Sequence, residues 1–431
     1  MKPTLLLWLA LLPAGCVGYQ ADPLPLVLNG TLPVTMGARQ EIDLSAPLDQ
    51  DAIAALAVLA NPDLKVLRSN AGISQAQVFA AGLLPDPSIS AGVDHIISGP
   101  DPVDNLALSL GLDINALRTR PVLRQQLQAR AEQVRLDIVW AEWQTVGQAK
   151  LQALRAVLLA QIMQIAESNA ADSRAILEAN LRAASRGDIG AQRLQSALLS
   201  ANDAAQTLRQ AQLDLQVARA QLNRVLGLAP ETVLQLVMPT IPTNAPGPQS
   251  LLSIALDSRA DLQALQRGYA AQEAAVHKAV LDQFPVLDLS LNTARDTGNN
   301  VLVGPAVNFT LPVWNRNRGG IALELASREA LKAEYENRLF QIRADIGAAL
   351  ASLSVERQQY QDQLAQAPAL ASYAVSSRQA AARGDMARID ASAAELALGQ
   401  SQRLLLQTRL NMLEQVVALE LLTGVSRQQW K

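Results

Sequence analysis

The chain has 431 residues, only 3% of them aromatic, and it is rich in alanine, leucine and glutamine. This composition is typical of long packed helices and argues against a compact globule. The formal net charge of −3 provides no basic field, so we predict no nucleic-acid partner. A single cysteine and two distant histidines exclude an internal disulfide and a clustered thiolate or imidazole metal site. We expect no cofactor and no metal site. Since no nucleophile motif or phosphate loop is present, the chain is predicted not to be an enzyme.

The N-terminus has the form of a secretory signal peptide over residues 1–15. A basic residue is followed by an apolar run over residues 5–12 and by small residues just before Cys16. The order resembles a bacterial lipoprotein signal, so we expect Cys16 to become the lipidated first residue, carrying palmitate. A plain secretory peptide with an incidental cysteine is the alternative. Val17 fits sorting to the outer membrane, and residues 16–50, rich in Pro and Gly, are expected to form an extended arm.

The sequence contains an internal repeat. Residues 51–228 and 250–425 show the same succession of elements, joined by a proline-rich connector over 229–249 and followed by a tail over 426–431. Each copy is predicted to begin with a helix, pass through a β-hairpin into a very long helix, reverse at a tip and return through another helix. In the first copy we expect the opening helix to run unbroken over 51–81.

Two β-hairpins are predicted, over 86–114 and 286–313, because apolar residues alternate there with small or polar ones. The clearest strand has Leu106, Leu108, Leu110, Leu112 and Ile114 on one face and Ala107, Ser109, Gly111 and Asp113 on the other. Four strands of about ten residues with this pattern fit outer-membrane barrel strands. A soluble, half-buried sheet is the alternative. After the signal no apolar run reaches about 18 residues, so a membrane crossing would have to use strands.

The two very long helices are expected over 121–184, with Pro121 as the first helical residue, and over 320–382. Their apolar residues are spaced three and four positions apart, which predicts coiled-coil packing. The chain is expected to reverse at tips over 186–190 and 383–387, where glycine permits the turn.

Four strands cannot close a barrel, and an open sheet edge in hydrocarbon would leave backbone groups without hydrogen bonds. Two copies would give eight strands with a filled interior, whereas three copies give twelve, enough for a pore. We therefore predict a mainly α fold with a small β part. Antiparallel coiled-coil hairpins would form an α-barrel, and four transmembrane strands per subunit would complete a 12-stranded barrel in a homotrimer embedded in outer-membrane lipid.

Several segments together resemble the TolC-like outer-membrane efflux family over nearly the whole mature chain. They are the lipoprotein start with Gly18-Tyr19, the helix opening Asn61-Pro62-Asp63-Leu64, the run LPVWNRNRGG over 311–320, and the paired tip glycines. The run after the second hairpin is most similar to members serving heavy-metal resistance pumps. The resemblance implies a passive exit duct for small toxic solutes, metal ions or drugs. It also implies two partners, a periplasmic adaptor and an inner-membrane transporter of the proton-driven resistance-nodulation-division type.

The resemblance also assigns roles to residues. Adaptor contact at the periplasmic tips falls to Gly187, Asp188, Gly384 and Asp385. Candidates for an entrance gate are Arg193, Arg388 and Asp390, with Arg193 and Asp390 expected to pair across subunits; the alternative is that these charges are simply solvated. The turn from strand to helix contains Trp314, Asn315 and Asn317, and Trp314 is a candidate for the aromatic belt of the bilayer.

Two other functions remain open from the sequence. The same tube could release secreted polypeptide (type I secretion). Alternatively, the hairpins could serve as coiled-coil binding arms of a periplasmic lipoprotein scaffold that makes no pore, although the alternation of the strands would then have no explanation.

Overall fold

The structure, a computed structural model, describes residues 44–100, 103–238, 245–284 and 286–430. The expected signal peptide, Cys16 and the arm up to residue 43 lie outside the described residues, as do residues 239–244 of the connector.

Both repeats contain the same order of elements. The first consists of α1 (Gln50–Ala60), α2 (Pro62–Gly82), β1 (Ser88–Asp94), β2 (Asn105–Asp113), α3 (Ile114–Ser185) and α4 (Ala191–Val225). The second consists of α5 (Pro248–Ser258), α6 (Ala260–Leu281), β3 (Val286–Arg295), β4 (Val301–Thr310), α7 (Arg318–Arg383) and α8 (Arg388–Thr423), followed by the 3-10 helix η1 (Arg427–Gln429). The predicted fold class, mainly helical with four strands, is confirmed for the single chain.

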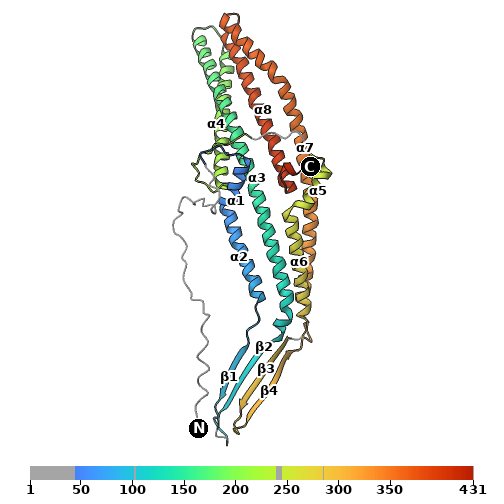
Figure 1. The fold of residues 1–431 in the computed structure, drawn as a ribbon. Coiled ribbons are helices and arrows are strands. Elements are labelled where there is room, and N and C mark those ends of the chain that lie inside the picture. Colours follow the sequence, from blue (N-terminus) through green and yellow to red (C-terminus); the bar gives the residue numbers. More distant parts are fainter. Residues whose placement is uncertain (1–43, 101–102, 239–244, 285, 431) are drawn as a thin grey trace.

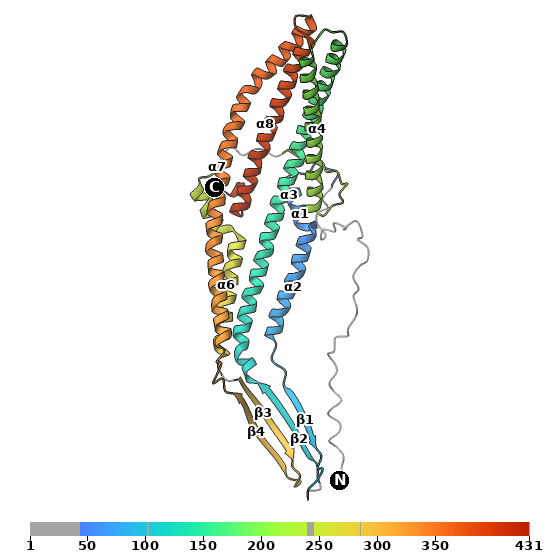
Figure 2. The same ribbon diagram turned by 180° about the vertical axis from the view of Figure 1, so that it is seen from behind.

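The molecule is a long rod (Figure 1). The sheet lies at one end, and the two tips, where α3 turns into α4 and α7 turns into α8, lie together at the other. The short helices α1 and α5 lie near the middle of the rod, and Figure 2 shows α2 and α6 running from there toward the sheet. Helix α3 contacts α2, α4, α6 and α8 and is therefore the spine of the chain.

Two expectations about helix boundaries were wrong. The opening helix is interrupted at Asn61, because Pro62 cannot donate a backbone hydrogen bond and Asn61 instead caps a new helix by accepting from the Leu64 N–H (2.9 Å). The first long helix begins at Ile114, seven residues before Pro121. Asp113 ends strand β2 and caps α3, since its Oδ1 accepts from the Ala116 N–H at 2.8 Å.

The four strands form one antiparallel sheet in the order β1-β2-β3-β4, so the two hairpins of the two repeats lie side by side. The register places Leu110 opposite Leu291 on one face, and Ser109 opposite Asn292 on the other. The Ser109 hydroxyl donates to Asn292 Oδ1 at 2.6 Å. The described sheet pairs β1 and β4 with one neighbour each, so both edges are open.

Three apolar clusters hold the helices together. They centre on Leu56 and Leu226 near α1, on Leu158, Leu215 and Leu413 between α3, α4 and α8, and on Leu251, Ile342 and Leu419 near α5. Fully burying one such side chain contributes about 1.5–3 kcal/mol. Close approach of α3 and α8 requires a glycine, because a Cβ at Gly147 would lie 2.3 Å from Leu421. Among the described helices, none has the length and apolar character needed to cross a bilayer.

Candidate functional site

The tip of the first repeat is a left-handed glycine turn that ends α3. Gly187 has φ +78°, and its N–H donates to the Ala184 carbonyl at 3.0 Å. The N–H of Asp188 reaches back to the Ala183 carbonyl at 2.9 Å. This pair of bonds is the Schellman arrangement, which satisfies carbonyl groups that the helix end would otherwise leave unpaired.

The tip of the second repeat has the same pair of backbone hydrogen bonds. Gly384 has φ +82° and donates to Ala381 O at 3.2 Å, while the N–H of Asp385 donates to Ala380 O at 2.9 Å. A side chain with a Cβ is strained at such a φ, so glycine is the residue that both turns require.

Each tip aspartate is paired within its own turn. Arg186 Nε donates to Asp188 Oδ2 at 2.8 Å, and Arg383 Nε donates to Asp385 Oδ2 at 2.9 Å. All four side chains remain more than half exposed. The two Arg-Gly-Asp triplets are therefore closed turns whose carboxylates are already neutralised by a neighbour.

Arg193 at the start of α4 and Asp390 at the start of α8 connect the two tips. Arg193 Nη2 lies 3.9 Å from Asp390 Oδ1, and the two side chains are 53% and 63% exposed. The structure thus brings these two gate candidates together within one chain. An exposed pair of this kind contributes about 0–1 kcal/mol, so it is a weak link. The third candidate, Arg388, makes no ion pair with any residue of the described ranges.

A second charged layer lies below the tip of the second repeat, one to two helical turns into α7 and α8. Arg378 of α7 forms a hydrogen-bonded ion pair with Glu395 of α8. Burial raises the pKa of the nearby Asp172 carboxyl on α3, the Glu395 carboxylate raises it further, and Arg378 opposes both. Three helices therefore meet at a place where protonation of one carboxyl changes their mutual repulsion.

The predicted strand-to-helix turn lies between β4 and α7. Asn317 has φ +48°, a left-handed conformation that asparagine tolerates, and its Nδ2 donates to the Ala279 carbonyl of α6 at 2.8 Å. A Cβ at Gly320 would lie 2.4 Å from Asn317 Oδ1, so glycine leaves room for this bond. The Asn315 carbonyl accepts from the Arg318 N–H at 3.0 Å, and Trp314 projects outward, 92% exposed.

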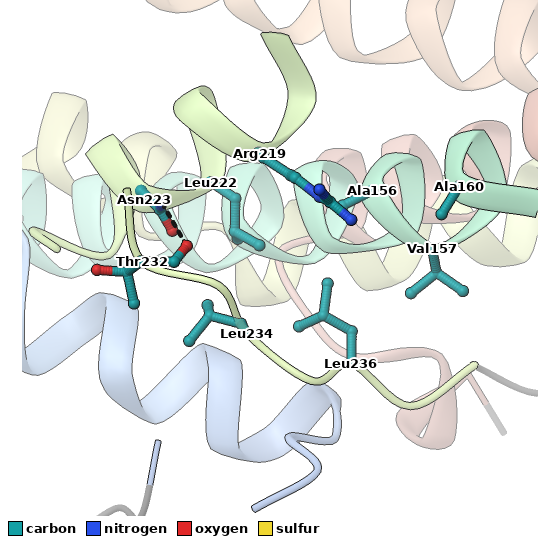
Figure 3. A pocket seen from close by; sticks show the side chains of 9 residues that line it. All are labelled: Ala156, Val157, Ala160, Arg219, Leu222, Asn223, Thr232, Leu234 and Leu236. Carbon is teal, nitrogen blue, oxygen red and sulfur yellow. Dashed lines mark hydrogen bonds between the residues drawn. The ribbon is translucent and has the colours of Figure 1, made fainter. Parts of the chain in front are cut away.

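A cavity of about 220 Å³ lies between α3, α4 and the connector (Figure 3). Its walls are mainly aliphatic, with the Arg219 side chain crossing over Ala156. The amide of Asn223 is already used, because it donates to the carbonyls of Pro230 (3.0 Å) and Thr232 (2.9 Å). No Asp, Glu or His is among the described residues that line the cavity. Within the described ranges, no three His, Cys, Asp or Glu side chains gather as a metal site would require.

Reasoning from the sequence missed a buried ion pair at the middle of the rod. Arg259, between α5 and α6, binds Asp261 through two hydrogen bonds of 2.9 and 2.7 Å. Its guanidinium lies 4.3 Å from the ring centroid of Trp140 on α3, a cation–π contact. The side chains of Arg259 and Asp261 are only 5% and 9% exposed. Alignment of the two repeats at Asp63 and Asp261 could have pointed to this place, but not to Trp140.

Comparison with known proteins adds a family and a fold. Residues 251–425, nearly the whole second repeat, match the family described as outer membrane efflux protein. No curated protein matches the chain in sequence. Among solved structures, the Campylobacter jejuni CmeC outer membrane channel is similar with a TM-score of 0.70 and 16% identity, over 95% of this chain and 94% of that one.

Two further structures agree. The outer membrane protein VceC from Vibrio cholerae has a TM-score of 0.68 and 17% identity, over 88% of this chain and 96% of its own. CusC, whose crystal structures concern folding and transmembrane channel formation, has a TM-score of 0.67 and 15% identity, over 95% and 99%. At such identities the likeness shows the fold, which extends over almost the full length of each protein. The expected resemblance is thereby confirmed by the family match over the second repeat and by the fold over most of the chain.

Proposed function

We propose that this chain, which carries an outer membrane efflux protein domain in its second repeat and the TolC-like fold throughout, is one of three identical subunits of an exit duct in the outer membrane. The observation that carries the proposal is the sheet. Its four strands are open at both edges and carry leucine and valine on one face, exposed in the single chain. In hydrocarbon, open edges leave backbone groups unsatisfied, so other subunits have to supply the missing neighbours.

Three subunits suit the molecule better than two. Twelve strands give a barrel wide enough for a pore, whereas eight strands give an interior filled by side chains. The face that would line the lumen carries residues such as Ser109 and Asn292, and polar interiors are typical of water-filled barrels. The exposed ring of Trp314 at the end of β4 would then lie at the level of the lipid headgroups.

The helical part would continue this pore as a tunnel in the periplasm. An adaptor would bind the tips, and a proton-driven inner-membrane transporter of the resistance-nodulation-division type would supply energy and choose the substrate. The duct itself would be passive and would release small toxic solutes, either metal ions or drugs. Gly187, Asp188, Gly384 and Asp385 would lie at the adaptor contact, while Arg193 and Asp390 would narrow the entrance.

Lipidation at Cys16 would hold the arm at the membrane. The test is the mass of the N-terminal peptide from purified protein, which should begin at Cys16 and carry acyl chains. Cys16→Ala should remain unprocessed or lose the acyl mass. A mature N-terminus elsewhere with an unmodified Cys16 would refute the anchor.

The central test is membrane fractionation followed by native mass determination in detergent. The protein should be found in the outer-membrane fraction with three times the subunit mass, and it should conduct ions in planar bilayers. Monomers alone, with no conductance, would favour the non-pore scaffold. Association with a polypeptide exporter instead of an efflux transporter would favour the secretion channel.

A further inference from the structure

The end of the sheet that meets the helices carries more basic than acidic side chains. Figure 1 shows the four strands joining α2, α3, α6 and α7 at this level. We call the connecting residues 83–88, 113–124, 278–288 and 310–320 the sheet–helix junction. They contain six basic and four acidic side chains, whereas the whole chain has a net charge of −3. The junction therefore reverses the sign of the overall charge.

Three of the four carboxylates of the junction are paired or lie on the polar face of the sheet. Asp282 accepts a hydrogen bond from Lys278 Nζ at 2.7 Å. Asp113 and Asp288 lie directly opposite each other on β2 and β3, on the face away from the exposed leucines. The fourth, Asp86 between α2 and β1, is exposed. The carboxylates thus leave the apolar side of the sheet end largely without negative charge.

Three of the six basic side chains are held within the chain. Besides Lys278, Arg118 lies over the ring of Phe284, 5.7 Å from its centroid, and Arg120 donates to the Gly82 carbonyl. The other three are exposed, and their side chains make no hydrogen bond or ion pair with any residue of the described ranges. They are Arg124, Arg316 and Arg318.

Arg316 and Arg318 belong to the turn between β4 and α7, which has a fixed backbone. Arg316 has φ +47° and Asn317 has φ +48°, so two successive residues are left-handed. The Asn317 side chain holds this turn to α6 through its 2.8 Å hydrogen bond to the Ala279 carbonyl. Each guanidinium presents parallel N–H donors that match the oxygens of a phosphate group. Two such groups at one anchored turn suit an anionic phosphate ligand.

The same turn is flanked by apolar side chains that nothing in the single chain covers. Phe309, Leu311 and Val313 are more than half exposed, and Trp314 projects outward. They extend the exposed leucine and valine face of the sheet up to the two arginines. A surface that joins apolar side chains to cations fits the boundary between lipid tails and headgroups. Free phosphate would engage the arginines but would leave the apolar residues uncovered.

We propose that Trp314, Arg316 and Arg318 bind the headgroup of an anionic phospholipid whose acyl chains lie along the apolar face of β4. This rests on the proposed function, which puts the sheet in the outer membrane, and it adds a lipid partner at the helix end of the barrel. The competing partner for the arginines is Asp86 of a neighbouring subunit, because closure of the barrel brings the β4 edge of one subunit to the β1 edge of another.

The test is native mass spectrometry of the full chain, purified in detergent, delipidated and titrated with phosphatidylglycerol or with phosphatidylcholine of the same acyl chains. We expect phosphatidylglycerol to bind about tenfold more tightly, which is the combined effect of two exposed ion pairs. Excess inorganic phosphate should not displace it, because phosphate has no acyl chains. Equal affinity for the two lipids, or full displacement by phosphate, would overturn the inference.

Variants separate the lipid site from the subunit contact and from the duct. Arg316→Gln with Arg318→Gln should abolish the preference for phosphatidylglycerol, and Trp314→Ala should weaken the binding of both lipids. Arg209→Gln, at an exposed arginine of α4 away from the sheet, should preserve the preference. If Asp86→Asn and the double arginine variant destabilise the trimer equally and leave lipid affinity unchanged, the arginines serve the subunit contact and the proposal is wrong. Trimers that conduct ions but show no lipid preference would contradict the lipid site alone, whereas the absence of trimers would contradict the proposed duct.

Discussion

Asn61 and Arg259 occupy equivalent positions in the two repeats and make the same long-range contact. Each lies between two short helices and donates a hydrogen bond to a carbonyl at the end of its repeat's return helix. Asn61 Nδ2 lies 2.8 Å from Val225 O, and Arg259 Nη1 lies 2.9 Å from Leu422 O. These two helix junctions, called joints below, hold the helix pairs α1–α2 and α5–α6 against the ends of α4 and α8 near the middle of the rod. One joint uses a neutral amide and the other a buried charge.

Substitution at the charged joint, Arg259, should lower the free energy of unfolding more than substitution at Asn61. In Arg259→Met, Arg338 would be the one ion-pair partner left to the buried Asp261 among the described residues, with its Nη1 at 3.6 Å. Removing one member of a buried pair costs about 3–5 kcal/mol, and we expect a loss of this size in thermal unfolding followed by circular dichroism. The control is Arg267→Met, which breaks a pair with Glu132 whose side chains are both 57% exposed and should cost about 0–1 kcal/mol. Equal losses would show that the Arg259 pair contributes no more than a surface pair.

Substitution at the neutral joint, Asn61, should cause a smaller loss of stability. Asn61→Ala removes both the cap of α2 and the bond to Val225, and the expected loss is about 1–2 kcal/mol. Asn61→Ser keeps a capping oxygen for the Leu64 N–H but cannot reach Val225. Its free energy of unfolding should therefore lie between those of Ala and wild type. If Ser and Ala are equally destabilised, the cap contributes nothing here.

The joint at Asn61 also needs a glycine just after the return helix α4. Gly227 has φ +64°, and a Cβ there would lie 2.5 Å from the Ala60 carbonyl oxygen. Gly227→Ala should destabilise the protein by about 1–3 kcal/mol through backbone strain alone, with the clash added. Gly72, inside α2, is the matched control, because a Cβ there meets nothing within 4 Å. Gly72→Ala should stabilise by about 0.4–1 kcal/mol, since alanine favours the helix. Loss of stability in both variants would mean that Gly72 is covered in the assembly.

Local patterns in the sequence predicted the elements well and their junctions poorly. The alternation in β2 placed Asp113 on the polar face of a strand, and its second role as the cap of α3 was hidden because one residue served both elements. The sequence therefore predicts the helix start at Pro121, seven residues too late. The Asn61-Pro62 pair did contain the signal for a helix break, but the alanine-rich pattern on both sides dominated the prediction.

Contacts across the repeats could not be predicted in the same way. The sequence shows Arg193 and Asp390 as opposite charges at equivalent places in the two repeats. Their contact within one chain depends on the relative orientation of the α3–α4 and α7–α8 hairpins, which no local pattern specifies. The contact of Arg259 with Trp140 depends on the crossing of α3 and α6, for which the sequence holds no local pattern.

Asp172 predicts a pH dependence. Its pKa is raised from an ordinary value of 3.8, first by burial and then by Glu395. The folded state therefore binds more protons than the unfolded chain between the two pKa values, so stability falls as the pH rises through that window. The penalty is complete above the folded pKa and absent below the unfolded one. Asp172→Asn should accordingly have a higher Tm than wild type at pH 7, and the difference should shrink as the pH falls through that window and disappear below the unfolded pKa of 3.8. A difference that is constant with pH would mean that Asp172 acts through packing.

The Arg193–Asp390 link predicts an electrostatic entrance. At 3.9 Å and more than half exposed, each link is weak, and three of them in a trimer would act together to hold the tips closed. Asp390→Arg replaces this attraction with repulsion between α4 and α8 and should raise the single-channel conductance in planar bilayers. Arg193→Asp with Asp390→Arg restores opposite charges and should return the conductance to that of wild type. Arg209→Gln, at an exposed arginine of α4 away from the tips, controls for the loss of a positive charge elsewhere on the helices. If the charge-swapped pair conducts as freely as the single variant, the two residues do not form the closure, and the entrance has to be narrowed by other contacts between the hairpins.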